Sequence, residues 1–321
     1  MKFKGRVKRV MKKYILVLLF FVLTACVSNE QSTHSNDGVA SSMVFISGGD
    51  FLMGSPLSEK DRDADERLHE VSVPSFKLSK YEVTKREFAK FVKATGYITD
   101  AERAVDEKHH CREYNYVDEW KLNKNMSWRN AKLIGQRQSN EKHPVVCVSW
   151  RDSQNYIKWL NETTGESYRL PTEAELEYVS RAGSQSRFTY GEKESNLCLY
   201  GNIADITKFK SGEQWRKVTP CSDGISFTNE VGKYKPNPFG VYDINGNVWE
   251  WTCSAFHKSY ENNYELSCAP LDFNKWLAVR GGSYSSVPRY LRSANRLKRK
   301  PFQSFANSGF RLAKDLKSSR I

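Results

Sequence analysis

The side chains best suited to chemistry lie in residues 240–251, where two tryptophans bracket a glutamate after a run of Asn, Asp and Gly. Such a run is not a regular helix or strand, because Gly and Asn favour positive φ and local side-chain turns. Its oxygen donors are Asp243, Asn245, Asn247 and Glu250. They suit a hard cation such as calcium, although this is no EF-hand loop. An Asx-rich turn that only delivers two tryptophans into a core explains the pattern equally well.

Six cysteines after residue 26 form a second reactive group: Cys111, Cys147, Cys198, Cys221, Cys253 and Cys268. An even number in an exported chain indicates disulfide bonds, with fifteen possible connectivities. The simplest order is sequential, 111–147, 198–221 and 253–268. Each bridge is expected to stabilise the fold by roughly 2–4 kcal/mol. No C-x-x-C motif occurs, so a zinc ribbon or thioredoxin-type site is unsupported.

Export is indicated by the N-terminus. Residues 1–25 contain seven Lys or Arg and no acid, and they include a short apolar run, which is the pattern of a secretory signal peptide. The ending Leu-Thr-Ala-Cys26 resembles a bacterial lipobox, in which the cysteine is lipidated and becomes the first residue. We therefore expect a lipoprotein anchored through Cys26, with an ordinary signal peptide as the alternative. Met11 would itself begin a complete signal.

The charge of the chain depends on that segment. The formal net charge is +13, seven of these charges lie in residues 1–25, and the mature protein is therefore about +6. The remaining surplus clusters in one late run: Arg289, Arg292, Arg296, Lys298, Arg299 and Lys300. A solvated surface is the commonest explanation of such a run, and nucleic acid is not an expected partner of an exported protein.

The elements that position these groups are few and short. Residues 26–42 are expected to form a flexible tether, residues 43–314 one domain, and residues 315–321 a tail. Short apolar pieces at 44–46, 145–148 and 277–279 predict strands between Gly and Asn turns. Together with the helices below, they predict a loop-rich α+β fold with few helices on short antiparallel strands.

Three helices are predicted from their capping residues. Thr84 and Glu87 form a capping box before an apolar face. A second helix opens at Ser149 or Asp152 and ends at Gly165. A third begins after Pro171, with Thr172 as the cap and Glu175 at the third helical position.

Several segments, taken in order, resemble the formylglycine-generating enzyme, or sulfatase-modifying factor, family. These segments are 45–55, 143–150, 168–175, 181–183, 237–251, 280–284 and 309–311. The most recognisable are Asn237-Pro-Phe-Gly to Trp251 and Arg280-Gly-Gly-Ser-Tyr284. The set covers nearly all of residues 43–314. The resemblance implies the family's variant of the C-type lectin fold.

The resemblance also implies two structural calcium sites that mix carboxylate, amide and main-chain oxygens. Carried over residue by residue, one site would use Asn202, Ile203, Asp223 and Ile225. The other would use Asp243, Gly246, Val248 and Glu250. The first set fits less well, because residues 205–219 are longer and more basic than the family pattern.

The chemistry of the family is where the sequence departs from it. The aerobic enzymes oxidise a substrate cysteine and bind copper(I) through two cysteines shortly after the Gly-Gly-Ser-aromatic block. Here Ser285 and Ser286 follow that block, and no cysteine occurs after Cys268. Hydroxyls are hard, weak ligands for copper. Trp249 and Ser283 match pocket residues of the enzymes. The alternative is that both are structural, with Ser283 ending a strand and Trp249 filling the core.

Iron has no clear site either. The usual facial triad needs two histidines and a carboxylate. The histidines of the domain are His69, His109, His110, His143 and His257, and none shows a convincing ligand spacing.

Two functions follow from these expectations. The first is a non-catalytic lipoprotein that binds protein or glycan at the cell envelope, as gliding-motility lipoproteins of the family are thought to do. The second is an oxidase that modifies a Cys or another group of an exported polypeptide. Because the residue after Cys26 is not Asp, we expect an outer-membrane location facing the periplasm.

Overall fold

The computed structural model describes residues 42–115, 119–131, 140–207, 215, 218–272 and 274–316. These described residues all belong to one compact unit. The expected signal peptide, the expected lipidation site Cys26 and the expected tether up to residue 41 lie outside the described residues.

Five α-helices are found in the described part of the chain: α1 (Lys85–Thr95), α2 (Asp100–Arg103), α3 (Trp150–Thr164), α4 (Glu173–Arg181) and α5 (Leu197–Tyr200). Short 3-10 helices occupy Glu107–His109, Glu194–Asn196, Glu261–Leu266 and Pro288–Leu291. The three predicted helices are confirmed as α1, α3 and α4. Each begins with a capping box, on Thr84, Ser149 and Thr172, and Ser149 rather than Asp152 is the cap of α3.

Two four-stranded sheets organise the fold. The first has the order β1 (Met43–Ile46), β4 (Phe76–Ser79), β12 (Ala313–Asp315) and β7 (Tyr168–Arg169), and it is antiparallel throughout. The second has the order β10 (Leu297–Arg299), β9 (Leu277–Arg280), β8 (Trp249–Ala255) and β11 (Ser308–Gly309). In it β11 runs parallel to β8. Two hairpins, β2 (Gly49–Met53) with β3 (His69–Val73) and β5 (Cys111–Asn115) with β6 (Glu119–Asn123), complete the architecture.

The strand predictions are partly correct. Residues 44–46 and 277–279 lie in β1 and β9, as expected. The strand predicted at 145–148 is wrong, because these buried residues have no strand structure and Cys147 has a φ of 58°. The irregular segment 240–251 also ends earlier than expected, since Trp249 already begins β8, a strand buried along its whole length.

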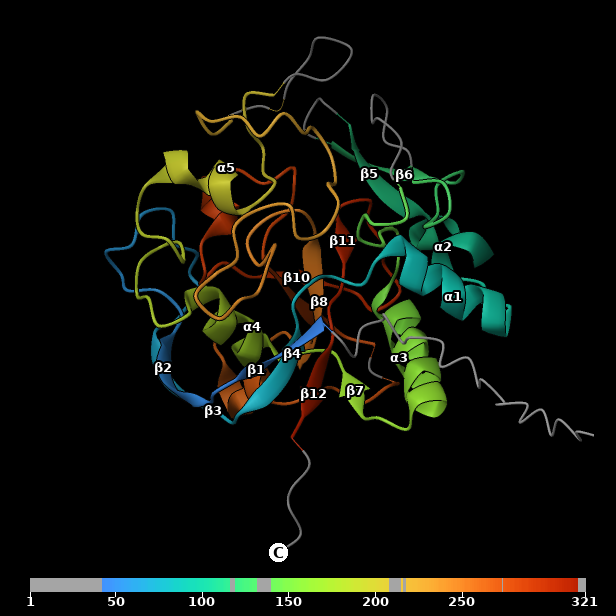
Figure 1. The fold of residues 1–321 in the computed structure, drawn as a ribbon, viewed down its shortest axis with the longest axis horizontal. Coiled ribbons are helices and arrows are strands. Elements are labelled where there is room, and N and C mark those ends of the chain that lie inside the picture. The colour runs from blue at the N-terminus through green and yellow to red at the C-terminus, as the bar shows by residue number, and fades with distance from the viewer. Residues whose placement is uncertain are drawn as a thin grey trace, which may run out of the picture. The chain divides into compact units, whose positions relative to one another are not determined.

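The core lies on both sides of β8 and β9. Figure 1 shows α1 and α3 side by side at one flank of these strands and α4 at the other. Aromatic side chains fill the α1–α3 side, where Phe88, Phe91, Tyr156 and Phe310 are in ring contact. The α4 side packs Leu176 and Val179 against the first sheet and the β2–β3 hairpin.

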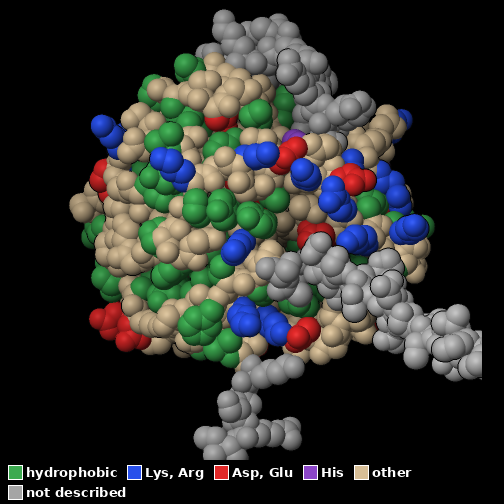
Figure 2. All heavy atoms as spheres, viewed as in Figure 1, with side chains coloured by type: hydrophobic (Ala, Val, Ile, Leu, Met, Phe, Trp, Pro, Cys, Tyr) green, Lys and Arg blue, Asp and Glu red, His purple; other side chains and the backbone are tan. Residues whose placement is uncertain are grey.

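The surface shows no extended patch of one charge on the face drawn in Figure 2. Lys and Arg side chains concentrate on the side of α1, α2 and α3, with Asp and Glu between them. Among the described residues, no helix has the length and apolar composition required to span a membrane.

Candidate functional site

The turn before β8 is a buried, hydrogen-bonded element built on left-handed residues. Asp243 and Asn247 both have a φ of 56°, and Gly246 has a φ of 120°. Asn245 points inwards, where its Nδ2 donates to Ser180 Oγ at 3.0 Å and to a backbone carbonyl. The oxygen donors of this turn are therefore removed from water, and each needs a partner within the fold.

Two loops that were predicted to carry separate calcium ligands interlock at the backbone. The Asn247 amide donates to the Asn202 carbonyl at 2.7 Å. A Cβ on Gly246 would lie 2.5 Å from that same carbonyl oxygen, and a Cβ on Gly201 would lie 1.9 Å from the Asn245 carbonyl oxygen. Both positions therefore require glycine, and the two mapped ligand sets lie against each other.

Three carboxylates and one guanidinium are buried beside this turn. Asp243 Oδ2 accepts a hydrogen bond from the Gly232 amide at 2.6 Å, and burial raises the pKa of Asp243 to about 6. Burial, with the charges of Asp243 and Glu250, raises the pKa of Glu82 well above its ordinary value. Glu250 is engaged by Arg311, which donates to both of its oxygens at 2.6 and 2.7 Å. Within the described structure, Asp243 Oδ1 and Glu82 Oε1 have no hydrogen-bond partner.

These contacts fit a cation at the second mapped set, with a change in its ligands. The partnerless oxygens belong to Asp243 and Glu82, whereas Glu250 is committed to its ion pair. Calcium accepts such carboxylates together with main-chain carbonyls like those of Gly246 and Val248. No group of three or more His, Cys, Asp or Glu in the described regions is arranged to hold a metal. Any cation here therefore depends on the carbonyls as well.

The first mapped set is partly assembled. Asn202 is fully buried and its Oδ1 has no hydrogen-bond partner among the described groups. Asp223 is held by hydrogen bonds from the Tyr234 hydroxyl at 2.6 Å and the Ile225 amide at 2.7 Å. Burial raises the pKa of Asp223 to about 7, and the neighbouring Asp205 adds to this. The main-chain oxygen of Ile203 was the fourth predicted ligand.

Trp249 and Ser283, the pocket residues matched by resemblance, are connected through Asn307. The Trp249 amide donates to the Asn307 carbonyl at 2.9 Å. Asn307 Nδ2 donates to the hydroxyls of Ser283 and Ser285 at 3.2 Å each. Ser283 Oγ also lies 3.3 Å from Ser286 Oγ. We call Ser283, Ser285, Ser286 and Asn307 the hydroxyl cluster, which can hydrogen-bond a polar ligand but offers no thiolate.

The structural explanation of the two matched residues holds in part. The Trp249 side chain fills the main aromatic core and is nearly inaccessible. Ser283 does not end a strand, because β9 stops at Arg280. Asn307 was not predicted, and its only sequence signal was its position two residues before the matched segment 309–311.

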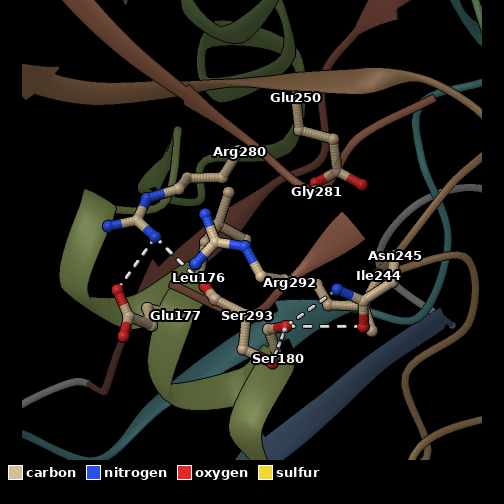
Figure 3. A pocket seen from close by; sticks show the side chains of 10 residues that line it. All are labelled: Leu176, Glu177, Ser180, Ile244, Asn245, Glu250, Arg280, Gly281, Arg292 and Ser293. Carbon is tan, nitrogen blue, oxygen red and sulfur yellow. Dashed lines mark hydrogen bonds and ion pairs between the residues drawn. The ribbon is translucent and has the colours of Figure 1, made fainter. Parts of the chain in front are cut away.

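A small internal cavity lies beside the turn but is no substrate site. Its volume is about 10 Å³, which is room for a single water molecule. Figure 3 shows its charged lining, in which Arg280 pairs with Glu177 at 2.8 Å and Ser180 bonds to Asn245. Its lining places the cavity between α4 and the second sheet.

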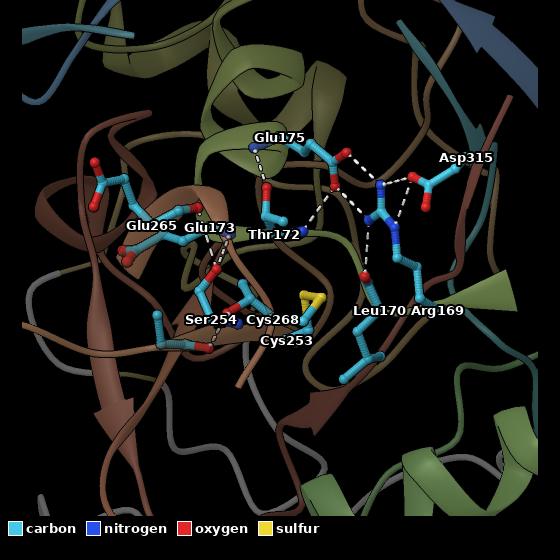
Figure 4. Close-up of a disulfide and its surroundings, with 12 residues drawn as sticks. Arg169, Leu170, Thr172, Glu173, Glu175, Cys253, Ser254, Glu265, Cys268 and Asp315 are labelled. Carbon is cyan, nitrogen blue, oxygen red and sulfur yellow. Dashed lines mark hydrogen bonds and ion pairs between the residues drawn. A yellow bond between two sulfur atoms is a disulfide. The ribbon is translucent and has the colours of Figure 1, made fainter. Parts of the chain in front are cut away.

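The sequential disulfide pairing is confirmed. The bonds join Cys111 to Cys147, Cys198 to Cys221, and Cys253 to Cys268. Figure 4 shows the third bond beside the start of α4, where Ser254 accepts from the Glu173 amide at 3.0 Å. All six cysteines of the domain are thereby in the oxidised, cross-linked form.

The basic run at 289–300 is not the solvated surface that was expected. Arg292, Arg296 and Arg299 are at most 5% exposed. Arg292 pairs with Glu66 and Arg296 with Glu173, each at 2.6 Å. Two of its six basic residues are thus buried in ion pairs, whereas Arg289 and Lys298 remain exposed.

The histidines do not converge on a common site. His143 is buried and its Nδ1 lies 3.0 Å from the Thr228 hydroxyl. His69 pairs with Glu265 at 3.5 Å, and His257 pairs with Glu261 at the same distance.

Comparison with known proteins agrees with this fold and site. Residues 28–316 match the family described as Sulfatase-modifying factor enzyme 1-like domain. The chain is 34% identical to the formylglycine-generating enzyme of Mus musculus over 299 residues, which cover 85% of this chain and 75% of that protein. It is 32% identical to the enzyme of the same name from Thermomonospora curvata, with 86% and 94% of the two chains covered.

A solved structure has a similar fold and a related sequence. PvdO from Pseudomonas aeruginosa superposes with a TM-score of 0.66 and 31% identity, over 85% of this chain and 94% of that chain. The family match over residues 28–316 and the similarity to these enzymes show that this chain belongs to the formylglycine-generating enzyme, or sulfatase-modifying factor, family.

Proposed function

We propose that this protein is a binding member of the family, which holds an exported polypeptide or glycan at the cell envelope without oxidising it. The observation that carries the proposal is the chemistry at the hydroxyl cluster. Ser285 and Ser286 follow Gly-Gly-Ser283-Tyr where the copper enzymes are expected to present thiolates. The cysteines of the domain are all used in disulfides. Soft copper(I) requires thiolate ligands, and hydroxyls do not replace them.

The alternative function is oxidation of a Cys or another group of an exported polypeptide. It is favoured by the identity to formylglycine-generating enzymes and by the preserved connection of Trp249 to Ser283 through Asn307. An activity of this kind would need a metal or oxidant held by other residues.

The decisive experiment offers the purified full-length protein a Cys-containing sulfatase-motif peptide, oxygen, and either copper(I) or iron(II). We expect the peptide to keep its thiol, measured by mass spectrometry and by an aldehyde-reactive probe. The mouse enzyme, treated in parallel, serves as the positive control. Formation of the aldehyde with either metal would establish the oxidase and overturn the binding role.

Binding itself is tested by mild cross-linking in the envelope. We expect the wild type to recover one defined exported partner. Ser285→Trp, which fills the half-buried edge of the hydroxyl cluster, should lose this partner. Ser47→Trp, an exposed position on the first sheet's side of the molecule, is the matched control and should keep it. Equal recovery by both variants would contradict binding at the cluster.

The proposal includes two properties that accompany this role. Calcium would be structural, held at the turn by Asp243 and Glu82 with backbone carbonyls. The lipid on Cys26 would place the domain at the outer membrane, facing the periplasm.

A further inference from the structure

One arginine of the basic run differs from its neighbours in having no counter-charge. Arg299 ends β10 and is 5% exposed. Its Nη1 has no hydrogen-bond partner in the described parts of the structure, and its Nη2 makes one long bond of 3.4 Å to Asn307 Oδ1. Its guanidinium lies 3.7 Å from the centre of the Phe305 ring.

The other deeply buried arginines of the second sheet and its surroundings are all neutralised. Arg280 and Arg296 share Glu173, Arg292 pairs with Glu66, and Arg311 pairs with Glu250. Among the described residues, no carboxylate lies within ion-pair distance of Arg299. An unpaired buried charge is unfavourable. The fold neutralises four buried arginines with carboxylates but leaves Arg299 without such a partner in the described structure.

A second cation increases the need for an anion at this place. The Arg112 guanidinium lies 5.4 Å from the centre of the same Phe305 ring. Burial, together with the positive charge of Arg112, lowers the pKa of Arg299 to about 9. Ser304, directly before Phe305, is fully buried and its hydroxyl likewise lacks a partner within the described structure. The segment around Phe305 thus holds excess positive charge and an unused hydroxyl.

The unpaired guanidinium is adjacent to the hydroxyl cluster. Asn307 accepts from Arg299 through its Oδ1 and donates to Ser283 and Ser285 through its Nδ2. Phe305 and Ser285 are half-buried, so this side of the site is partly exposed to solvent. The Asn307 side chain therefore connects the Arg299 guanidinium to the hydroxyl cluster, which is the proposed binding region.

We propose that Arg299, supported by Arg112 and Asn307, binds a carboxylate of the ligand, namely an Asp or Glu side chain or a C-terminal carboxylate of an exported polypeptide. A carboxylate matches the planar guanidinium and needs few further donors. A phosphate carries more charge and more acceptor oxygens than one free Nη and one hydroxyl satisfy. This inference rests on the proposed binding role and names the ligand group that the pocket takes.

The test uses small probes on the purified full-length protein. N-acetylglycine presents a carboxylate, N-acetylglycinamide is the neutral analogue of the same size, and inorganic phosphate is the competing anion. We expect calorimetric titration to show binding of N-acetylglycine only, weakening as salt increases. In Arg299→Met this binding should fall by at least about tenfold, the loss typical of a charge-assisted hydrogen bond. Lys298→Met, on the exposed side of the same strand, should bind as the wild type does.

The stability of Arg299→Met separates a ligand site from a structural arginine. Because the substitution removes an unpaired buried charge, the ligand-free variant should melt at the same or a higher temperature than the wild type. A lower melting temperature, unchanged N-acetylglycine binding in Arg299→Met, or tighter binding of the amide or phosphate would each overturn the proposal. These probes contain no thiol, so the outcome is independent of whether the protein oxidises a peptide.

Discussion

At the scale of single residues, buried charge is the main property of this protein. Glu250 and Arg311 neutralise each other through two short hydrogen bonds. Glu82 and Asp243 lie next to this pair, and each has an oxygen without a partner in the described structure. Two excess carboxylates at one buried place repel each other, and this repulsion is the physical reason to expect a cation there.

Calcium is expected to stabilise the fold through these two residues. In excess calcium the melting temperature should rise by several degrees over that in chelator, because a ligand at a hundred times its Kd contributes about 2.7 kcal/mol. Asp243→Asn and Glu82→Gln should each abolish most of the rise. Differential scanning calorimetry measures it.

The matched control for this experiment is Asp315→Asn, since Asp315 is an exposed carboxylate paired with Arg169. It should retain the full calcium response. A wild type that melts at the same temperature with and without calcium would refute the cation site. If calcium still raises the melting temperature of Asp243→Asn, the cation site lies elsewhere.

At the scale of elements, short helices and irregular loops are held by local caps and by cross-links. The α4 helix begins at Thr172, whose side chain accepts from the Glu175 amide. Arg169 holds Glu175 from outside at 2.6 Å. Next to this helix start, the Cys253–Cys268 bond closes the loop between β8 and the chain that returns to β9. The caps set where helices begin, and the disulfides restrict the loops that carry no periodic structure.

The Cys253–Cys268 bond is expected to contribute substantially to stability. Its 15-residue separation corresponds to about 3 kcal/mol of lost denatured-state entropy. Cys253→Ala combined with Cys268→Ala should lower the free energy of unfolding by roughly 2–4 kcal/mol. Denaturant unfolding measures this, in oxidising and in reducing buffer.

Reductant provides the control for the cross-link. Relative to the wild type, the double variant should lose less stability on reduction, because one bond is already missing. If oxidised wild type and double variant unfold at the same denaturant concentration, the bond contributes nothing measurable and the expectation is wrong.

At the scale of the whole molecule, the proposed binding region combines the hydroxyl cluster with Arg299. Arg299, at the end of β10, contacts Asn307, just before β11, and Asn307 in turn contacts Ser283 of the hydroxyl cluster. We propose that the lipid on Cys26 keeps this region near the membrane through the tether 26–42. Such anchoring raises the local concentration of the domain near its envelope partners.

Anchoring is tested by fractionation of cells that produce the full-length chain. The wild type should sediment with outer membranes, and Cys26→Ser should appear in the soluble periplasmic fraction. Val27→Asp is the control, because it keeps the lipidated cysteine and should move the protein to the inner membrane. Membrane retention of Cys26→Ser would contradict the anchor.

The sequence by itself determined two kinds of feature, namely short local motifs and the order of family segments along the chain. The three capping boxes lie within four residues each, so their hydrogen bonds depend little on the rest of the chain. The family and its fold follow from blocks in a fixed order, of which 237–251 and 280–284 are the clearest. The sequential disulfide order was the simplest of fifteen possibilities, and the structure selects it. The strand expected at 145–148 failed because an apolar run indicates burial but not the left-handed turn at Cys147.

Only the tertiary structure decided which charges meet. The carboxylates of Glu82 and Asp243 are brought near each other, and Arg292 forms an ion pair with Glu66. Both pairs are far apart in the sequence, so no local pattern predicts them. The run 289–300 has the composition of a solvated surface, yet Arg292 and Arg296 are buried in ion pairs with acids far away in the sequence. Within the described structure Arg299 has no carboxylate partner, because the segment around Phe305 and Asn307 offers aromatic, hydroxyl and amide groups. Long-range pairing is a property of packing, and for that reason the candidate ligand site became visible only in three dimensions.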